Sequence, residues 1–179
     1  AVGIDINAEV RRTLQLMTAD WDDASLSAIA ELSDELPRVA IAPAQLRQVM
    51  LNLLRNAAQA MGGRGCLHVR TRVRARGEER YVVVSVQDDG PGIAPAALKS
   101  IFLPFYTTKS DGTGLGLAIC QRIVQSAGGR IEVRSREGEG TTFDLVFDAA
   151  MEALGTPTPA ASMGSVAPSA LERSPDQVD

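Results

Sequence analysis

Residues 107–117 read Thr-Thr-Lys-Ser-Asp-Gly-Thr-Gly-Leu-Gly-Leu, a glycine-rich turn that leads directly into an apolar run with helical spacing. Glycine lets the backbone bend sharply and come close to a ligand, and the free N–H groups of a first helical turn attract anions. The side chains here that can add a positive charge or a hydroxyl donor are Lys109, Thr107, Thr108 and Thr113. By itself the stretch fits either a phosphate-binding turn or an ordinary tight connection before a helix.

The overall composition indicates one globular domain in a reducing compartment. The chain has 179 residues, 45% of them hydrophobic and 22% charged, and its net charge of −4 provides no basic field for nucleic acid. Cys66 and Cys120 are too few for a disulfide framework and lack metal-site spacing. No apolar run approaches the ~18 residues of a membrane span, and the N-terminus has no signal pattern. We therefore expect a cytoplasmic protein, or the cytosolic part of a membrane-bound one, without direct membrane contact.

The N-terminal part of the chain combines one clear helix with one ambiguous segment. Apolar residues at helical spacing predict an amphipathic helix over 5–18, which either Asp5 or Asn7 can cap. The segment 24–41 fits a strand or a helix by its pattern, and the alternation at 39–41 indicates a short strand.

The clearest helix is predicted over 43–61, where a proline suits the first turn and two glycines follow the last. Its expected buried stripe consists of Leu46, Val49, Met50, Leu53, Ala57 and Ala60. Its opposite stripe carries mostly amides, namely Gln45, Gln48, Asn52, Asn56 and Gln59, with Arg55 beside them. Asparagine is a poor interior helix residue because its side chain competes for backbone hydrogen bonds. The stripe is therefore either a solvated polar face or a row of neutral amides that lines a site and can ligate Mg²⁺.

Two alternating runs, 66–74 and 81–87, predict a β-hairpin with one buried face of valine and leucine. The other face of the first run carries His68, Arg70, Arg72 and Arg74. Such a row suits an acidic partner or, as we favour, a solvated sheet face. His68, the only histidine of the chain, is then expected to be an exposed strand residue without a catalytic role.

The second run of the hairpin leads into Asp88-Asp89-Gly90-Pro91-Gly92-Ile93. A carboxylate at a strand end can face a pocket, and the glycines after it let a planar ring approach the backbone; alternatively, these residues form an ordinary turn. A short helix is expected over 95–103. The aromatic residues that follow form either a packing plug or the hinge of a mobile loop, and they are Phe102, Phe105 and Tyr106.

The remainder of the chain divides into ordered elements and a tail. After a helix predicted over 113–127, two strands are expected over 130–136 and 141–148. From residue 149 onward proline, alanine and serine are frequent, which predicts a flexible tail or linker over 149–179. The folded domain is therefore expected to cover residues 1–148.

The order of these motifs resembles that of the catalytic, ATP-binding domain of bacterial sensor histidine kinases, in the GHKL group with gyrase and MutL. An Asn-x-x-x-Asn helix is followed by a strand with Asp-x-Gly-x-Gly, then by Phe-x-x-Phe, and then by Gly-x-Gly-x-Gly before a helix. The resemblance covers about residues 5–148 and implies an α+β fold, a two-layer α/β sandwich whose mixed, mostly antiparallel sheet has helices on one face. A P-loop is excluded, because the chain has no Gly-x-x-x-x-Gly-Lys pattern.

The resemblance implies a role for several single residues. Asn52-Leu-Leu-Arg-Asn56 is similar to the family's N box, so Asn56 is the expected Mg²⁺ ligand, with Asn52 and Arg55 near the phosphates. Asp88 matches the first position of the first glycine box and is expected to accept a hydrogen bond from the adenine amino group, which favours adenine over guanine. Residues 102–109 resemble the family's F box, and residues 112–116 resemble its second glycine box. The other residues expected to bind ATP lie in or next to these boxes and the first glycine box, and they are Gly90, Gly92, Ile93, Thr107, Thr108, Lys109, Gly112, Thr113, Gly114, Leu115, Gly116 and Leu117.

Three departures from the family pattern bear on mechanism. Gln59 stands where many of these kinases carry lysine, so Arg55 or Lys109 is expected to supply the positive charge. Asn52 stands where hydrolytic GHKL ATPases carry a general-base glutamate, which favours phosphoryl transfer over hydrolysis. The acceptor histidine is expected to come from outside this chain, because His68 lies on a predicted strand.

The resemblance therefore implies a protein histidine kinase domain that uses ATP and Mg²⁺ and is expected to be a monomer. It would phosphorylate a histidine on a separate dimerisation domain, with a response regulator downstream, and no residue of its own would act as acid, base or nucleophile. The alternatives are a non-transferring ATP-sensing module of the same fold and an anti-sigma-type serine kinase; the Phe-x-x-Phe box and the tail favour the sensor family. The segment 107–117 is expected to close over ATP as a mobile lid.

Overall fold

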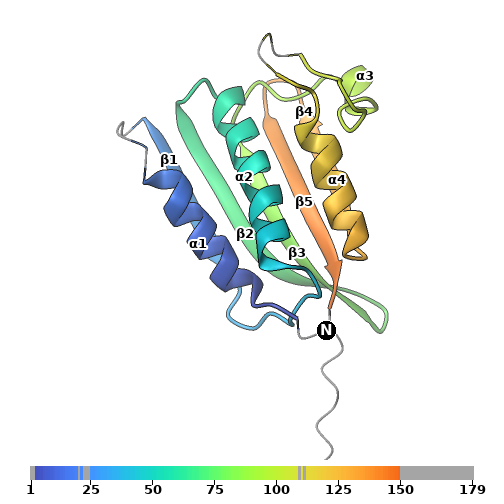
Figure 1. Cartoon of the computed structure of the whole chain (residues 1–179). Helices are drawn as coiled ribbons and strands as arrows, with labels where there is room; N and C mark the ends of the chain where they lie inside the picture. Colours follow the sequence, from blue (N-terminus) through green and yellow to red (C-terminus); the bar gives the residue numbers. More distant parts are fainter. Residues whose placement is uncertain (1–2, 20, 22–24, 109, 111, 150–179) are drawn as a thin grey trace, which may run out of the picture.

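In a computed structural model, the chain forms a five-stranded sheet with helices packed on one of its faces (Figure 1). The structure describes residues 3–19, 21, 25–108, 110 and 112–149. The strands follow the order β1-β2-β3-β5-β4, in which β1 pairs with β2 in parallel and every other neighbouring pair is antiparallel. This arrangement is the predicted α+β sandwich with a mixed, mostly antiparallel sheet.

Most elements lie where the sequence predicts them. Their bounds are α1 Ile6–Thr18, β1 Leu26–Leu32, α2 Pro43–Ala60, β2 Gly65–Arg76, β3 Glu79–Asp88, α3 Pro95–Leu98, α4 Gly116–Ser126, β4 Arg130–Arg136 and β5 Gly140–Asp148. In the part of the chain that the structure describes, no helix is long and apolar enough to cross a membrane. The predicted tail lies, from residue 150 onward, outside the described residues.

The ambiguous segment at 24–41 contains strand β1 and a long connection to α2. β1 adds to the sheet edge beside β2, with pairs such as Ala28 opposite Leu67. Of the short strand expected at 39–41, only an isolated bridge between Ile4 and Val39 forms. The pattern alone was ambiguous because an edge strand with one half-covered face alternates only weakly.

Two helices are shorter than predicted. The helix expected over 95–103 is limited to the single turn α3, because the chain continues in tighter turns: the N–H groups of Ser100 and Leu103 donate to carbonyl oxygens three residues back, at 2.8 and 2.9 Å, and not four. Helix α4 begins at Gly116 and not near 113, because Gly114 has a left-handed φ of 67° that no right-handed helix can include.

One hydrophobic core lies between the sheet and the helices. The strand register places valines and leucines opposite one another on the helix-covered face, as in Val84 opposite Leu145. Helix α2 lies between α1 and α4 (Figure 1), so its buried arc is wider than one stripe and also includes Leu54. Ala60, predicted to be buried, is exposed because it is the last residue of α2.

The helix-free face of the sheet is solvent-facing, as expected, but its arginines are ion-paired across strands. Arg70 of β2 contacts Glu31 of β1 at 2.8 Å, and Arg74 contacts Glu132 of β4 at 3.0 Å. His68 departs from the prediction of an exposed residue. It is half-buried between its strand neighbours on β1 and β3, and its Nδ1 is covered without a hydrogen-bond partner.

Asp144 of β5 is the centre of this ion-paired face. Its side chain is only 2% exposed, and it accepts hydrogen bonds from Ser85 of β3, from Arg134 of β4 at 3.0 Å and from Arg72 of β2 at 3.5 Å. The two arginines neutralise the buried carboxylate, and with Ser85 they join four strands through one side chain.

We predict that Asp144→Ala lowers the free energy of unfolding by about 1–3 kcal/mol in urea denaturation. The loss stays below that of a fully buried ion pair, because both arginines are partly exposed and regain water. Asp148→Ala is the matched control, since Asp148 lies on the same strand and face but is exposed, and it should change stability by less than about 0.5 kcal/mol. Equal losses for the two variants would show that the network does not stabilise the sheet.

Candidate functional site

A cavity of about 560 Å³ opens between α2, the segment after β3 and the glycine-rich segment before α4. The sequence-predicted site residues that line it are Asn52, Arg55, Asn56, Asp88, Gly92, Ile93, Thr107, Thr108, Gly112, Thr113, Gly114, Gly116 and Leu117. Gly90 and Leu115 are not part of the lining, and Lys109 lies outside the described residues. The separate sequence motifs thus meet in one cavity.

The wall formed by α2 presents part of the amide stripe. Asn52 and Asn56 lie one turn apart and are half-buried, and Arg55 is exposed, whereas Gln48 one turn earlier is exposed away from the cavity. The stripe therefore lines a cavity in its second half and faces solvent in its first half. The first half thus matches the solvated polar face, and the second half lines a cavity, as a row of amides at a site requires.

The buried thiol of Cys120 on α4 packs against this wall. Its Sγ lies 3.8 Å from the carbonyl oxygen of Val49, one turn before Asn52. Burial raises the pKa of the Cys120 thiol to about 11, against a smaller lowering by a hydrogen bond from Asn52. Cys120 is thus a buried, neutral thiol.

Asp88 ends β3 at the cavity with only 4% of its surface exposed. Burial raises the pKa of its carboxyl group, and hydrogen bonds from the backbone N–H groups of Gly90 and Thr141 lower it to a smaller extent. The Gly90 N–H donates to Oδ1 at 2.9 Å, and a Cβ at Gly90 would lie 2.8 Å from the same oxygen. Gly90 therefore shapes the acceptor without lining the cavity.

The loop after Asp88 packs backbone against backbone on the turn between β4 and β5. Gly92 has a φ of 74°, and a Cβ there would lie 1.9 Å from the carbonyl oxygen of Arg136. Gly140 has a φ of 85°, and its Cβ would lie 2.0 Å from the carbonyl oxygen of Asp88. Any side chain at either position would separate the two segments, so both approaches require glycine.

The aromatic segment (102–106) contacts the second glycine box (112–116) through Phe105 and Gly114. Phe105 has a left-handed φ of 67°, its N–H donates to the carbonyl oxygen of Gly114 at 2.9 Å, and a Cβ at Gly114 would lie 2.4 Å from Phe105. Phe102 packs edge-on against Phe143, with ring centroids 6.4 Å apart, whereas Phe105 is 76% exposed. The aromatic cluster thus splits into one packing residue and one residue that anchors the glycine box through its backbone.

Helix α4 directs its N-terminus at the cavity. Gly116 and Leu117 of its first turn line the cavity, and its N-cap residue, Leu115, makes no side-chain cap hydrogen bond. The N–H groups of a first helical turn and the helix dipole make this end of the cavity favourable for an anion.

Sequence reasoning did not find the residues that β5 and the apolar wall contribute. The lining also includes Thr141 and Phe143 of β5, and Ile101 and Tyr106 from the segment after α3. Both β5 residues were expected only as part of the strand over 141–148. The pairing of Asp88 with Thr141 across β3 and β5 is the signal that would have located both β5 residues, and it is available only once the sheet order is known.

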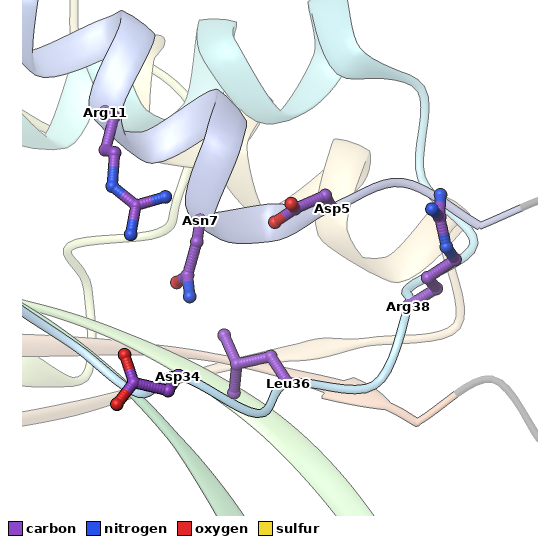
Figure 2. A pocket seen from close by; sticks show the side chains of 6 residues that line it. All are labelled: Asp5, Asn7, Arg11, Asp34, Leu36 and Arg38. Atoms are coloured by element: carbon purple, nitrogen blue, oxygen red, sulfur yellow. The ribbon is translucent and has the colours of Figure 1, made fainter.

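A second cavity of about 260 Å³ lies at the N-terminal end of α1 (Figure 2). Its lining residues come from α1 and from the segment after β1, and they are Asp5, Asn7, Arg11, Asp34, Leu36 and Arg38. Several of its polar groups serve the fold: Asp5 caps α1 by accepting from the Ala8 N–H at 3.1 Å, and Asn7 bridges Ser33 and Thr71 at 2.7 and 2.8 Å. The sequence motifs fall in the larger cavity, which is therefore the candidate site.

Comparison with known proteins agrees with this geometry. Residues 41–151 match the family described as histidine kinase-, DNA gyrase B-, and HSP90-like ATPase. The sensor histidine kinase ZraS of Escherichia coli K12 is 42% identical over 142 residues, which cover 79% of this chain and 30% of ZraS. The histidine-protein kinase AtoS of the same strain is 40% identical over 144 residues, which cover 80% of this chain and 23% of AtoS. The chain thus spans less than a third of the length of these relatives.

Solved structures give the same result. The catalytic domain of histidine kinase ThkA, in a nucleotide-free form, superposes with a TM-score of 0.71 at 31% identity and covers 83% of this chain and 95% of that one. Full-length ShkA in complex with AMPPNP superposes with a TM-score of 0.70 at 31% identity over 83% of this chain and 31% of ShkA. The chain belongs to the histidine kinase-, DNA gyrase B- and HSP90-like ATPase family, where it corresponds to the catalytic, ATP-binding domain of sensor histidine kinases.

Proposed function

We propose that the chain binds ATP and Mg²⁺ in the 560 Å³ cavity and transfers the γ-phosphoryl group to a histidine on a separate dimerisation domain in two-component signalling. The proposal rests mainly on the meeting of Asp88, the Asn52 and Asn56 amides and the N-terminus of α4 in one cavity. A buried acceptor suits the base, amide oxygens suit a hard cation, and a helix N-terminus suits the phosphates.

The base end of the cavity fits adenine. Ile93, Ile101 and Phe143 provide apolar surface for a planar ring, and Asp88 lies beside them as a buried acceptor. The adenine amino group would donate to this carboxylate, whereas guanine would present a carbonyl oxygen and leave the carboxylate unpaired.

The phosphate end lies between α2 and α4. A Cβ at Gly116 would meet only the side chain of Asn52, at 4.0 Å, so the two helices leave room between them. Asn56 would ligate Mg²⁺, which would neutralise charge on the phosphates when bound, while Arg55 and the first-turn N–H groups of α4 would hold phosphate oxygens. Lys109 remains a further candidate for phosphate contact.

The residues that line the cavity favour phosphoryl transfer over hydrolysis of ATP. Among the described residues that line the cavity, Asp88 is the only carboxylate, and it lies at the base end. No described carboxylate beside the phosphates would activate water, so the residues named above would act by positioning and charge stabilisation. His68 is not part of the lining, so the acceptor histidine would be supplied by a separate domain.

The cellular setting follows from the same proposal. The relatives named above are sensor kinases several times the length of this chain, so we infer that its natural partners are a histidine-bearing dimerisation domain and, downstream, a response regulator. A domain that consumes ATP would work in the cytoplasm, whether free or as part of a membrane-bound kinase.

The direct test is phosphoryl transfer in trans. Incubation of the chain with γ-labelled ATP, Mg²⁺ and a separately purified dimerisation hairpin from a related sensor kinase should label the acceptor histidine of the hairpin. A hairpin with that histidine replaced by alanine is the control and should remain unlabelled. Tight ATP binding without transfer would instead indicate an ATP-sensing module, and label on a serine would indicate a serine kinase.

Asp88→Asn should separate binding from stability. We expect ATP affinity, measured by calorimetry, to fall by roughly ten- to a hundredfold, because a charge-assisted hydrogen bond is lost. Without nucleotide, the variant should unfold at the same temperature as the wild type or at a higher one. Burial raises the pKa of Asp88, so its charged form opposes folding at neutral pH, and the neutral amide removes this effect. A variant that loses both stability and binding would indicate a structural role for the carboxylate.

The raised pKa of Asp88 also predicts two opposite pH effects. ATP affinity should fall as pH decreases toward the raised pKa, because protonation removes the charged acceptor. The folded protein holds this proton more tightly than the unfolded chain, so the stability contributed by Asp88 should decrease as pH rises from its ordinary pKa through the raised one. The difference in unfolding temperature between wild type and Asp88→Asn, followed against pH, measures this contribution.

Asn56→Ala should abolish most of the Mg²⁺-dependent gain in ATP affinity while leaving Mg²⁺-independent binding nearly unchanged, because an amide ligand of the cation is lost. ATP titrations with Mg²⁺ and with a chelator measure the two values. Gln48→Ala, which removes an exposed amide two turns earlier on the same helix, is the matched control and should behave as wild type. A Mg²⁺ effect that survives in Asn56→Ala would contradict the assignment of this residue.

A further inference from the structure

At the end of the cavity next to Asp88, where the base is proposed to bind, one wall belongs to no helix or strand. After Asp88 the chain leaves the sheet, and residues 89–94 contain neither helix nor strand. The wall is instead fixed from the opposite side by the β4–β5 hairpin. The Gly138 N–H donates to the carbonyl oxygen of Pro91 at 2.7 Å, and the Ile93 N–H donates to the hydroxyl of Ser135 at 2.8 Å.

Ser135 joins three parts of this end of the cavity. Besides accepting from Ile93, its Oγ donates to the carbonyl oxygen of Gly140 at 2.9 Å and lies 2.9 Å from Oγ1 of Thr141. Ile93 and Thr141 line the cavity, whereas Ser135 does not. One half-buried hydroxyl thus connects the loop wall, the glycine that packs on Asp88 and the threonine beside Asp88.

The donors and acceptors in this cluster leave one proton arrangement. A carbonyl oxygen only accepts and a backbone N–H only donates, so the single proton of Ser135 goes to Gly140 and its lone pairs receive the Ile93 N–H. Thr141 must then donate its own proton to Ser135. This leaves the Thr141 hydroxyl with only lone pairs to offer the cavity, next to the Asp88 carboxylate.

We propose that Ser135 is a positioning residue for nucleotide selectivity, which holds the Ile93 wall and the Thr141 hydroxyl where an adenine base fits against Asp88. The inference rests on the proposed function, since it requires that the cavity binds ATP. Ser135 acts through Ile93 and Thr141 and does not itself touch the nucleotide. Without its hydroxyl, the Ile93 N–H loses its partner and the Thr141 proton is free to turn toward the base.

The test compares ATP and GTP affinities of the 179-residue chain and its variants by calorimetry. Ser135→Ala should weaken ATP binding roughly three- to tenfold, with GTP binding little changed, so the preference for ATP falls by the same factor. Ser135→Thr keeps the hydroxyl and should restore most of the preference. Recovery by threonine is not expected if Ser135 matters only for packing.

Ser85→Ala is the matched control for lost stability. Ser85 is also a strand serine with a bonded hydroxyl, but it lies on the helix-free face, away from the cavity lining. It should lower the unfolding temperature and leave the ATP preference as in wild type. An unchanged preference in Ser135→Ala, or an equal loss in Ser85→Ala, would overturn the inference while leaving the proposed function intact. Absence of ATP binding by the wild-type chain would overturn both.

Discussion

The burial of one carboxylate determines the geometry at one end of the cavity. Asp88 is 4% exposed, and a charged group so far from water is stable only if hydrogen-bond donors reach it. The backbone N–H groups of Gly90 and Thr141 do so. The first requires the chain to turn back within two residues, and the second requires β5 to pair with the very end of β3. The close approach of Gly140 to the Asp88 backbone follows from that pairing.

Several residues in or beside the cavity lining are unfavourable for folding, and the rest of the domain offsets them. Asn52 and Asn56 lie inside a helix, where asparagine weakens the backbone ladder, and Phe105 holds a left-handed conformation that side chains avoid. The compensation comes from the core beneath α2 and from the helix-free face, where Asp144 joins four strands. Such unfavourable residues can persist around one cavity only if many interactions in the surrounding structure hold them in place.

The sequence predicted what depends on local spacing and missed what depends on distant pairing. The amide spacing of Asn52 and Asn56 placed both on one side of α2, and the alternation of valines predicted β2 and β3. Gly140 and Thr141, in contrast, looked like an ordinary hairpin turn and strand start, because nothing near them shows that they lie against Asp88. The start of α4 was misplaced for a similar reason: the left-handed backbone of Gly114 is set by its contact with Phe105, a segment earlier in the chain.

The two faces of the sheet differ in how readily their residues can be substituted. Its helix-covered side holds the cavity, where Asp88 and the glycines that touch its backbone admit few replacements. On its open side, apart from the buried Asp144, the ion pairs join half-exposed side chains, such as Arg74 with Glu132, and such pairs can be exchanged or reversed in sign at little cost. Because distant substitutions act nearly independently, the open side can diversify its surface charge between related proteins while the cavity stays constant. One fold can in this way present different surfaces around the same cavity.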